Sequence, residues 1–165
     1  MNGIELVNKL VFYRFVDTPE NHEFFMENLY KFSELNKKEF NEPDNVFDNL
    51  FNVFNDSENF EPLNYIVFEI FDFEKLKIFD ESIFIDKVLN NLSKIIEISK
   101  VWTEEVFKGL LQYKFKKYLA LKISNIDNNL KELIFNLIQY ILKENYNNEM
   151  QEVAKYILDS EKLKG

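Results

Sequence analysis

Apolar residues recur along most of the chain with the spacing of an α-helix, in which every third or fourth residue lies on the same face. The clearest run starts at Leu130 and repeats over almost four turns to Leu142. Similar runs, some of them weaker, cover residues 24–32, 46–54, 63–71 and 150–158. Each run predicts a helix with one buried face and one solvated face.

The segment 65–73 is rich in residues that favour β-strands, so its pattern decides between strand and helix. A half-buried strand alternates apolar and polar residues strictly. Here one parity holds Val67, Glu69, Phe71 and Phe73, which mixes the two kinds. The alternation fails, and the helical spacing favours a helix.

Helix start signals agree with the periodicity. Thr18 offers an N-cap followed by Pro19 at the first helical position, Asp127 precedes another apolar run, and Asn147 or Asn148 can cap the last helix. We predict helices over residues 4–15, 19–36, 44–54, 62–72, 81–98, 101–111, 113–124, 128–144 and 148–159.

Short connections make successive helices antiparallel neighbours. We therefore expect one all-α domain over residues 1–165, with eight or nine short antiparallel helices. They would form either stacked helical hairpins, as in an α-solenoid, or an irregular bundle.

Composition supports a helical protein and excludes several alternatives. With 3 Gly and 3 Pro the chain lacks the turn residues of a β-sandwich or barrel, and without cysteine it has no disulfide, no thiolate zinc site and no cysteine nucleophile. The abundance of Phe and Asn is typical of an AT-rich genome. We expect the phenylalanines, and the lone Trp102, to be mainly core residues.

No catalytic motif is present, so we expect neither an enzyme nor a cofactor or metal site. The single histidine, His22, is interpreted as a surface helix residue, and glycines are too scattered for a phosphate-binding loop. The run from Asp56 to Glu58 lacks the spacing of a calcium loop, so Asp56 or Ser57 is expected to cap the helix that follows. Residues 1–16 lack signal-peptide features and no stretch is apolar enough to cross a membrane, which favours a cytoplasmic protein.

Charge is unevenly distributed along the chain. The net charge is −9, but residues 39–86 hold 13 acids against 2 lysines and residues 87–131 hold 9 lysines against 4 acids. Such an acidic protein is not expected to bind nucleic acid directly or to bind anionic membranes. Solvation alone is one explanation for this acidity. The other is a docking face for a basic partner.

The predicted docking residues lie at turns and helix starts, which fall on neighbouring edges if helical hairpins stack in order. They are Asp44, Asp48, Asp56, Glu58, Glu61, Asp72, Glu74 and Asp80. Four phenylalanines among these acids are expected to be mostly core, although some are candidates for apolar anchors: Phe47, Phe60, Phe73 and Phe79.

Residues 53–112 carry a recognisable order of features. An apolar helix ends in Phe54-Asn55-Asp56-Ser57-Glu58, a second apolar helix follows over residues 63–71, and Val101-Trp102 opens a helix that ends near Gln112. In this order the chain resembles the immunity protein 30 family of bacterial polymorphic-toxin systems. The resemblance implies an α-helical antidote that binds and neutralises a co-expressed toxin, and it supplies no catalytic residues.

We therefore expect an immunity protein that neutralises a cognate toxin, typically a basic nuclease, through an acidic face. Two alternatives remain open at this point. One is a phage-type nuclease inhibitor, such as an anti-CRISPR or DNA-mimic protein, and the other is a non-catalytic helical adaptor or scaffold.

Overall fold

The computed structural model describes residues 1–56, 60–144 and 146–165, and within them the chain forms nine α-helices and no strand. The predicted all-α class is confirmed, and segment 65–73 is helical. The helices are α1 (Gly3–Phe12), α2 (Pro19–Ser33), α3 (Pro43–Phe51), α4 (Phe60–Lys75), α5 (Glu81–Ile95), α6 (Lys100–Leu110), α7 (Lys116–Ile123), α8 (Asn128–Lys143) and α9 (Asn148–Lys164). Two short 3₁₀ helices, η1 (Lys37–Glu39) and η2 (Tyr113–Phe115), lie in the connections.

The chain divides into two compact units. Unit 1 comprises Met1–Asp80 with Glu97–Lys100, and unit 2 comprises Glu81–Ile96 with Val101–Gly165. That the whole chain folds as a single domain stays a prediction. All of the predicted docking residues, from Asp44 to Asp80, belong to unit 1.

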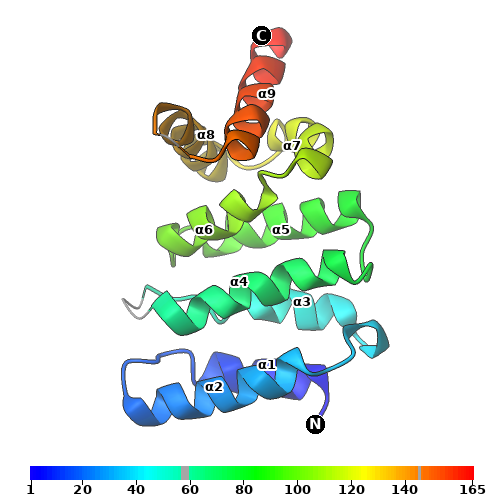
Figure 1. The fold of residues 1–165 in the computed structure, drawn as a ribbon, viewed down its shortest axis with the longest axis vertical. Coiled ribbons are helices and arrows are strands. Elements are labelled where there is room, and N and C mark those ends of the chain that lie inside the picture. The colour runs from blue at the N-terminus through cyan, green and yellow to red at the C-terminus, as the bar shows by residue number, and fades with distance from the viewer. Residues whose placement is uncertain (57–59, 145) are drawn as a thin grey trace. The chain divides into compact units, whose positions relative to one another are not determined.

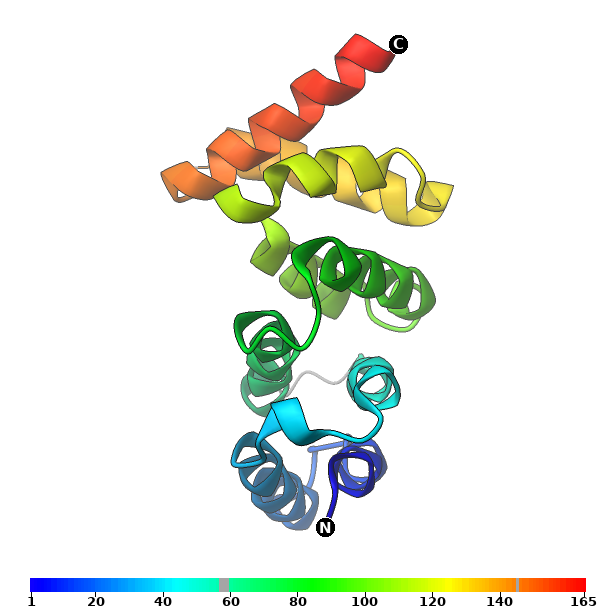
Figure 2. The ribbon, with the colours of Figure 1, turned by 90° about the vertical axis from the view of Figure 1, so that its right-hand side faces the viewer.

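Unit 1 is built from two helical pairs. The first pair, α1 and α2, packs together, while α3 packs on α1 and α4 packs on both α2 and α3 (Figure 1). Figure 2 shows the same two pairs end-on. Each helix turns its apolar stripe to the others, as Leu6 and Leu10 of α1 and Ile66 and Ile70 of α4 do. Within unit 1 this arrangement corresponds to the first of the two architectures left open by the sequence, stacked helical hairpins.

Helix starts follow the signals in the sequence. The side chain of Thr18 accepts a hydrogen bond from the backbone N–H of Asn21 at 3.2 Å, with Pro19 at the first helical position. Asn147 accepts from Met150 N–H at 2.9 Å in the same way, which decides the cap of α9. Asn2 forms a capping box with Glu5, in which each side chain bonds the other's backbone N–H. The predicted capping by Asp56 or Ser57 falls on a turn that includes residues outside the described ones.

Phenylalanine rings fill the centre of unit 1. Phe47 of α3, Phe73 of α4 and Phe79 are buried, and their ring centroids lie 5.2–5.8 Å apart. Such edge and offset contacts contribute about 0.5–1.5 kcal/mol per pair beyond the burial of area. These three rings are therefore core residues rather than anchors exposed to a partner. The Phe60 side chain lies outside the described part of the structure.

Unit 2 has its own core. Helix α5 packs against α7 and α8, and α9 packs against α7 and α8. Trp102 of α6 is 1% exposed, which confirms it as a core residue. Lys164 at the end of α9 donates to the Ala120 carbonyl at 3.1 Å and to the Ser124 hydroxyl at 2.8 Å, so it closes the C-terminal end of α7.

Candidate functional site

The division into units concentrates the negative charge in one of them. Counted from the sequence, unit 1 holds 18 acidic and 8 basic residues, which gives −10. Unit 2 holds 11 acidic and 12 basic residues, which gives +1. The excess of acidic residues therefore resides in unit 1, whose surface is the candidate functional site.

Helix α3 presents its acids on the side opposite to its apolar stripe. Val46 and Leu50 are buried, whereas Asp44 in the first turn is exposed and Asp48 one turn later is half-buried. Helical periodicity forces this separation, because residues two positions from an apolar stripe point away from the core. Asp44 also lies at the positive end of the helix dipole, where a carboxylate is favourable.

Three further predicted docking residues are exposed. Asp56 follows α3, Glu61 lies in the first turn of α4, and Asp80 ends the continuous part of unit 1. Glu58 lies outside the described residues. We refer to Asp44, Asp56, Glu61 and Asp80 as the four exposed acids.

The last two predicted docking residues are engaged inside the fold. Asp72 is half-buried and pairs with Lys37, whose Nζ lies 3.1 Å from its Oδ2. Glu74 is 2% exposed and its Oε1 lies 3.2 Å from Nζ of Lys77. Both fall near the C-terminal end of α4, where the helix turns these positions inward. Their carboxylates act in the structure of unit 1 rather than as surface charges.

A buried cluster of charges was not singled out by sequence reasoning. Lys37 of η1 is 2% exposed, and its ammonium pairs with both Glu69 and Asp72 of α4 while lying 5.6 Å from the centre of the Phe32 ring. Burial raises the pKa of Glu69 above its ordinary value, and the adjacent Lys37 ammonium opposes part of that rise. The only sign of this cluster in the sequence is the acidic Glu69 within the apolar run of α4. Its partner Lys37 is not predictable from a local pattern, because it lies far from Glu69 in the sequence.

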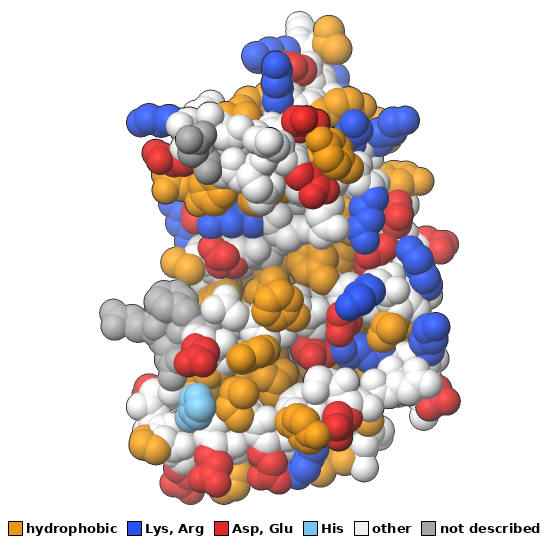
Figure 3. All heavy atoms as spheres, in the orientation of Figure 1, with side chains coloured by type: hydrophobic (Ala, Val, Ile, Leu, Met, Phe, Trp, Pro, Cys, Tyr) orange, Lys and Arg blue, Asp and Glu red, His pale blue; other side chains and the backbone are white. Residues whose placement is uncertain are grey.

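Exposed aromatic residues of unit 1 are a second feature that the periodicity did not reveal. Phe12 of α1 is 76% exposed, and Phe68 of α4 is 66% exposed, with the Tyr65 ring centre 6.5 Å from its own. Figure 3 shows hydrophobic side chains lying among acidic ones on the face of unit 1 turned toward the viewer. Aromatic side chains in such mixed surfaces are common anchors in protein interfaces.

His22 is half-buried in the first turn of α2. Within the part of the chain that the structure describes, no group of three His, Cys, Asp or Glu residues is arranged to hold a metal ion. None of the helices described is long and apolar enough to cross a membrane.

In comparisons with models of protein families, with curated protein sequences and with solved structures, the chain had no significant match. Membership of the immunity protein 30 family therefore stays a prediction from the resemblance described above.

Proposed function

We propose that the chain is an immunity protein that binds a basic toxin domain through the acidic surface of unit 1. A nuclease is the toxin that we expect. It must carry positive charge to hold its nucleic acid substrate, and that charge would complement the acidic surface of unit 1. An antidote of this kind needs no chemistry of its own. It needs a complementary surface that covers the toxin's active site or the path of its substrate.

The observation that carries this proposal is the charge partition between the two units. A generic solvating charge would be spread over both units, whereas here unit 1 holds −10 and unit 2 holds +1. A strong local field of one sign accelerates encounter with a partner of opposite charge and helps to set its orientation. The four exposed acids lie at the surface, where they contribute to this field.

Apolar contacts would supply the affinity that exposed charges alone do not. Isolated surface ion pairs contribute about 0–1 kcal/mol each. Buried aromatic anchors contribute about 2 kcal/mol or more when they fill a pocket of the partner. Phe68 and Tyr65 of α4 are exposed aromatic residues on the same unit as the acids and are available for this role.

Co-expression with the product of the adjacent gene tests the proposal. The tagged chain should co-purify with a basic toxin domain, bind it with nanomolar affinity or tighter, and suppress its activity in a purified assay. A set of phage structural genes around the locus, together with inhibition of a host nuclease, would replace this function with that of a phage inhibitor. A partner that is not a toxin and whose association is independent of salt would instead identify an adaptor.

A further inference from the structure

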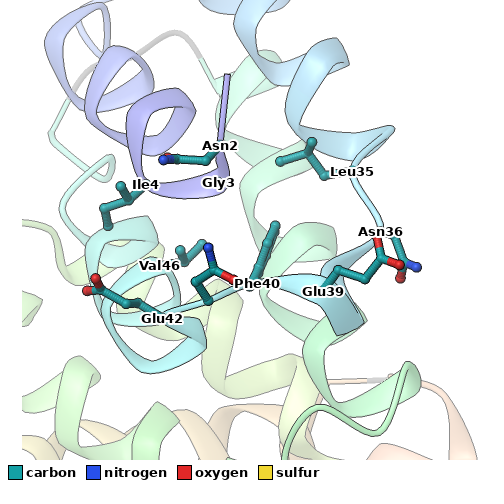
Figure 4. Close-up of a pocket in the computed structure, with 10 residues that line it drawn as sticks. Asn2, Gly3, Ile4, Leu35, Asn36, Glu39, Phe40, Glu42 and Val46 are labelled. Atoms are coloured by element: carbon teal, nitrogen blue, oxygen red, sulfur yellow. The ribbon is translucent and has the colours of Figure 1, made fainter.

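A pocket of about 260 Å³ lies in unit 1 between the start of α1 and the connection from α2 to α3. Its apolar lining comes from Ile4, Leu35, Phe40 and Val46 (Figure 4). Polar residues from the same elements complete the wall, among them Asn2, Asn36, Asn41, Glu39 and Glu42. The lining is therefore mixed, with apolar side chains and polar ones in similar share, two of the polar ones being carboxylates.

Gly3 allows α1 to approach the ring that forms the centre of this pocket. A Cβ at position 3 would lie 2.8 Å from Cε1 of Phe40, which is closer than real Cβ atoms come to other atoms. The Phe40 ring also lies 5.8 Å from the Phe32 ring and 5.7 Å from the Phe73 ring. The ring is thus held from several sides, and it stands between Glu39 and Glu42 in Figure 4.

The two carboxylates give the pocket its chemistry. Glu39 is exposed and forms neither a hydrogen bond nor an ion pair with the described part of the chain through its carboxylate. Glu42 is exposed, and its carboxylate accepts a hydrogen bond from the amide of Asn45. The two carboxylates lie on opposite sides of Phe40 (Figure 4), so an occupant with one positive charge would contact one of them, in a unit whose net charge is already negative.

We propose that this pocket receives one arginine side chain of the toxin. The cavity is smaller than the roughly 300–1,000 Å³ of small-molecule sites, which suits a single side chain. The aliphatic part of an arginine would lie on Leu35 and Val46, while its weakly hydrated, planar guanidinium would meet Phe40 and the Glu39 carboxylate. This inference rests on the proposed function, since it names the anchor by which the basic partner is held.

A small probe tests the pocket without the toxin. N-acetyl-arginine methylamide is titrated into the labelled protein, and amide NMR signals are followed at Ile4, Leu35 and Val46. We expect these signals to shift with the arginine compound and to stay in place with its neutral citrulline counterpart. The variant E39Q/E42Q should lose the response, while E23Q, an exposed acid on α2, should keep it. Equal shifts with citrulline, or an unchanged response in E39Q/E42Q, would overturn the inference.

The cognate toxin separates a failure of this inference from a failure of the proposed function. E39Q/E42Q should lower affinity for the toxin about 30-fold, the change expected when one interface hot spot is lost, and E23Q should leave it nearly unchanged. Tight toxin binding that E39Q/E42Q does not weaken would refute the pocket and leave the proposed function intact. Absence of any toxin partner, together with a positive arginine titration, would refute the function and the identity of the occupant but retain the guanidinium-binding pocket.

Discussion

The Lys37 ammonium lies 3.1 Å from the Asp72 carboxylate, in a position where Lys37 is 2% exposed. It also pairs with Glu69, one helical turn before Asp72 on α4. A single lysine of η1 therefore compensates two carboxylates of α4 and fastens the connection between the two helical pairs of unit 1.

Removing this lysine should destabilise unit 1 strongly. K37M deletes the ammonium and leaves the buried Glu69 without its cation, so we expect the free energy of unfolding to fall by about 3–5 kcal/mol. Urea denaturation measures the change. K38M, at the exposed neighbouring position, should stay within about 0.5 kcal/mol of the wild type. The double variant K37M/E69Q should recover part of the loss, because the buried position 69 no longer carries a charge, although Asp72 still lacks its cation. A K37M protein as stable as K38M would show that the buried pair has no structural role.

The raised pKa of Glu69 predicts a specific pH dependence. Because the folded-state pKa lies above the ordinary 4.5, the folded protein holds this proton more tightly than the unfolded chain does. The resulting stabilisation is fully present below about pH 4.5 and is lost as pH rises through the folded-state pKa. The variant E69Q lacks this titration. The difference in free energy of unfolding between wild type and E69Q should therefore move in favour of E69Q as pH rises above 4.5. Movement in the opposite direction would mean that Lys37 outweighs desolvation and that the pKa is lowered.

Lys77 adopts a backbone conformation that usually belongs to glycine. Its φ is 58°. The N–H of Lys77 donates to the Glu74 carbonyl at 2.8 Å, and the N–H of Ile78 donates to the Phe73 carbonyl at 2.9 Å. This pair of hydrogen bonds is the Schellman ending of a helix. K77G and K77A both remove the contact with Glu74, but only glycine relieves the strain. Thermal denaturation should show K77G to be more stable than K77A by about 1 kcal/mol. Equal stabilities would mean that this turn carries no such strain.

In the variant G3A, two effects change the free energy of unfolding in opposite directions. Alanine is favoured over glycine by about 0.5–1 kcal/mol in a helix interior and by less at the first helical position, which Gly3 occupies, whereas overpacking against Phe40 costs about 1–3 kcal/mol. We expect the clash to dominate and the free energy of unfolding to fall by about 1 kcal/mol. F40L replaces the ring with a shorter side chain. In that background G3A should cost little, so that G3A/F40L is nearly as stable as F40L. A stabilising G3A in the wild-type background would show that the Phe40 ring moves aside freely.

The helices were predictable because their signals are local. The periodicity from Leu130 to Leu142 and the caps at Thr18 and Asp127 act within a few residues, so each start was found at or near its observed position. The differences occur at ends with weaker signals. Helix α9 continues to Lys164 rather than stopping at residue 159, and α4 begins at Phe60 rather than at residue 62.

The candidate site was only partly predictable, because burial depends on contacts that are distant in sequence. The acids at positions 44, 56, 61 and 80 are exposed, as a docking role requires, but nothing local distinguished them from Glu74, which α4 turns inward. The pairing of Lys37 with residues more than thirty positions away, and the pocket between α1 and Phe40, exist only once the helices are packed.

The rate of association with the toxin tests the central claim, that the exposed acids of unit 1 guide docking. The variant D44N/D56N/E61Q removes three charges from unit 1, and E132Q/E144Q/D159N removes three from exposed positions of unit 2. Both variants have the same total charge, so a difference between them reports the position of the charge. In stopped-flow experiments at low salt, we expect the unit 1 variant to associate about tenfold more slowly, with a weaker dependence on salt and a nearly unchanged dissociation rate. The unit 2 variant should associate at close to the wild-type rate. Equal association rates for the two variants would contradict the account.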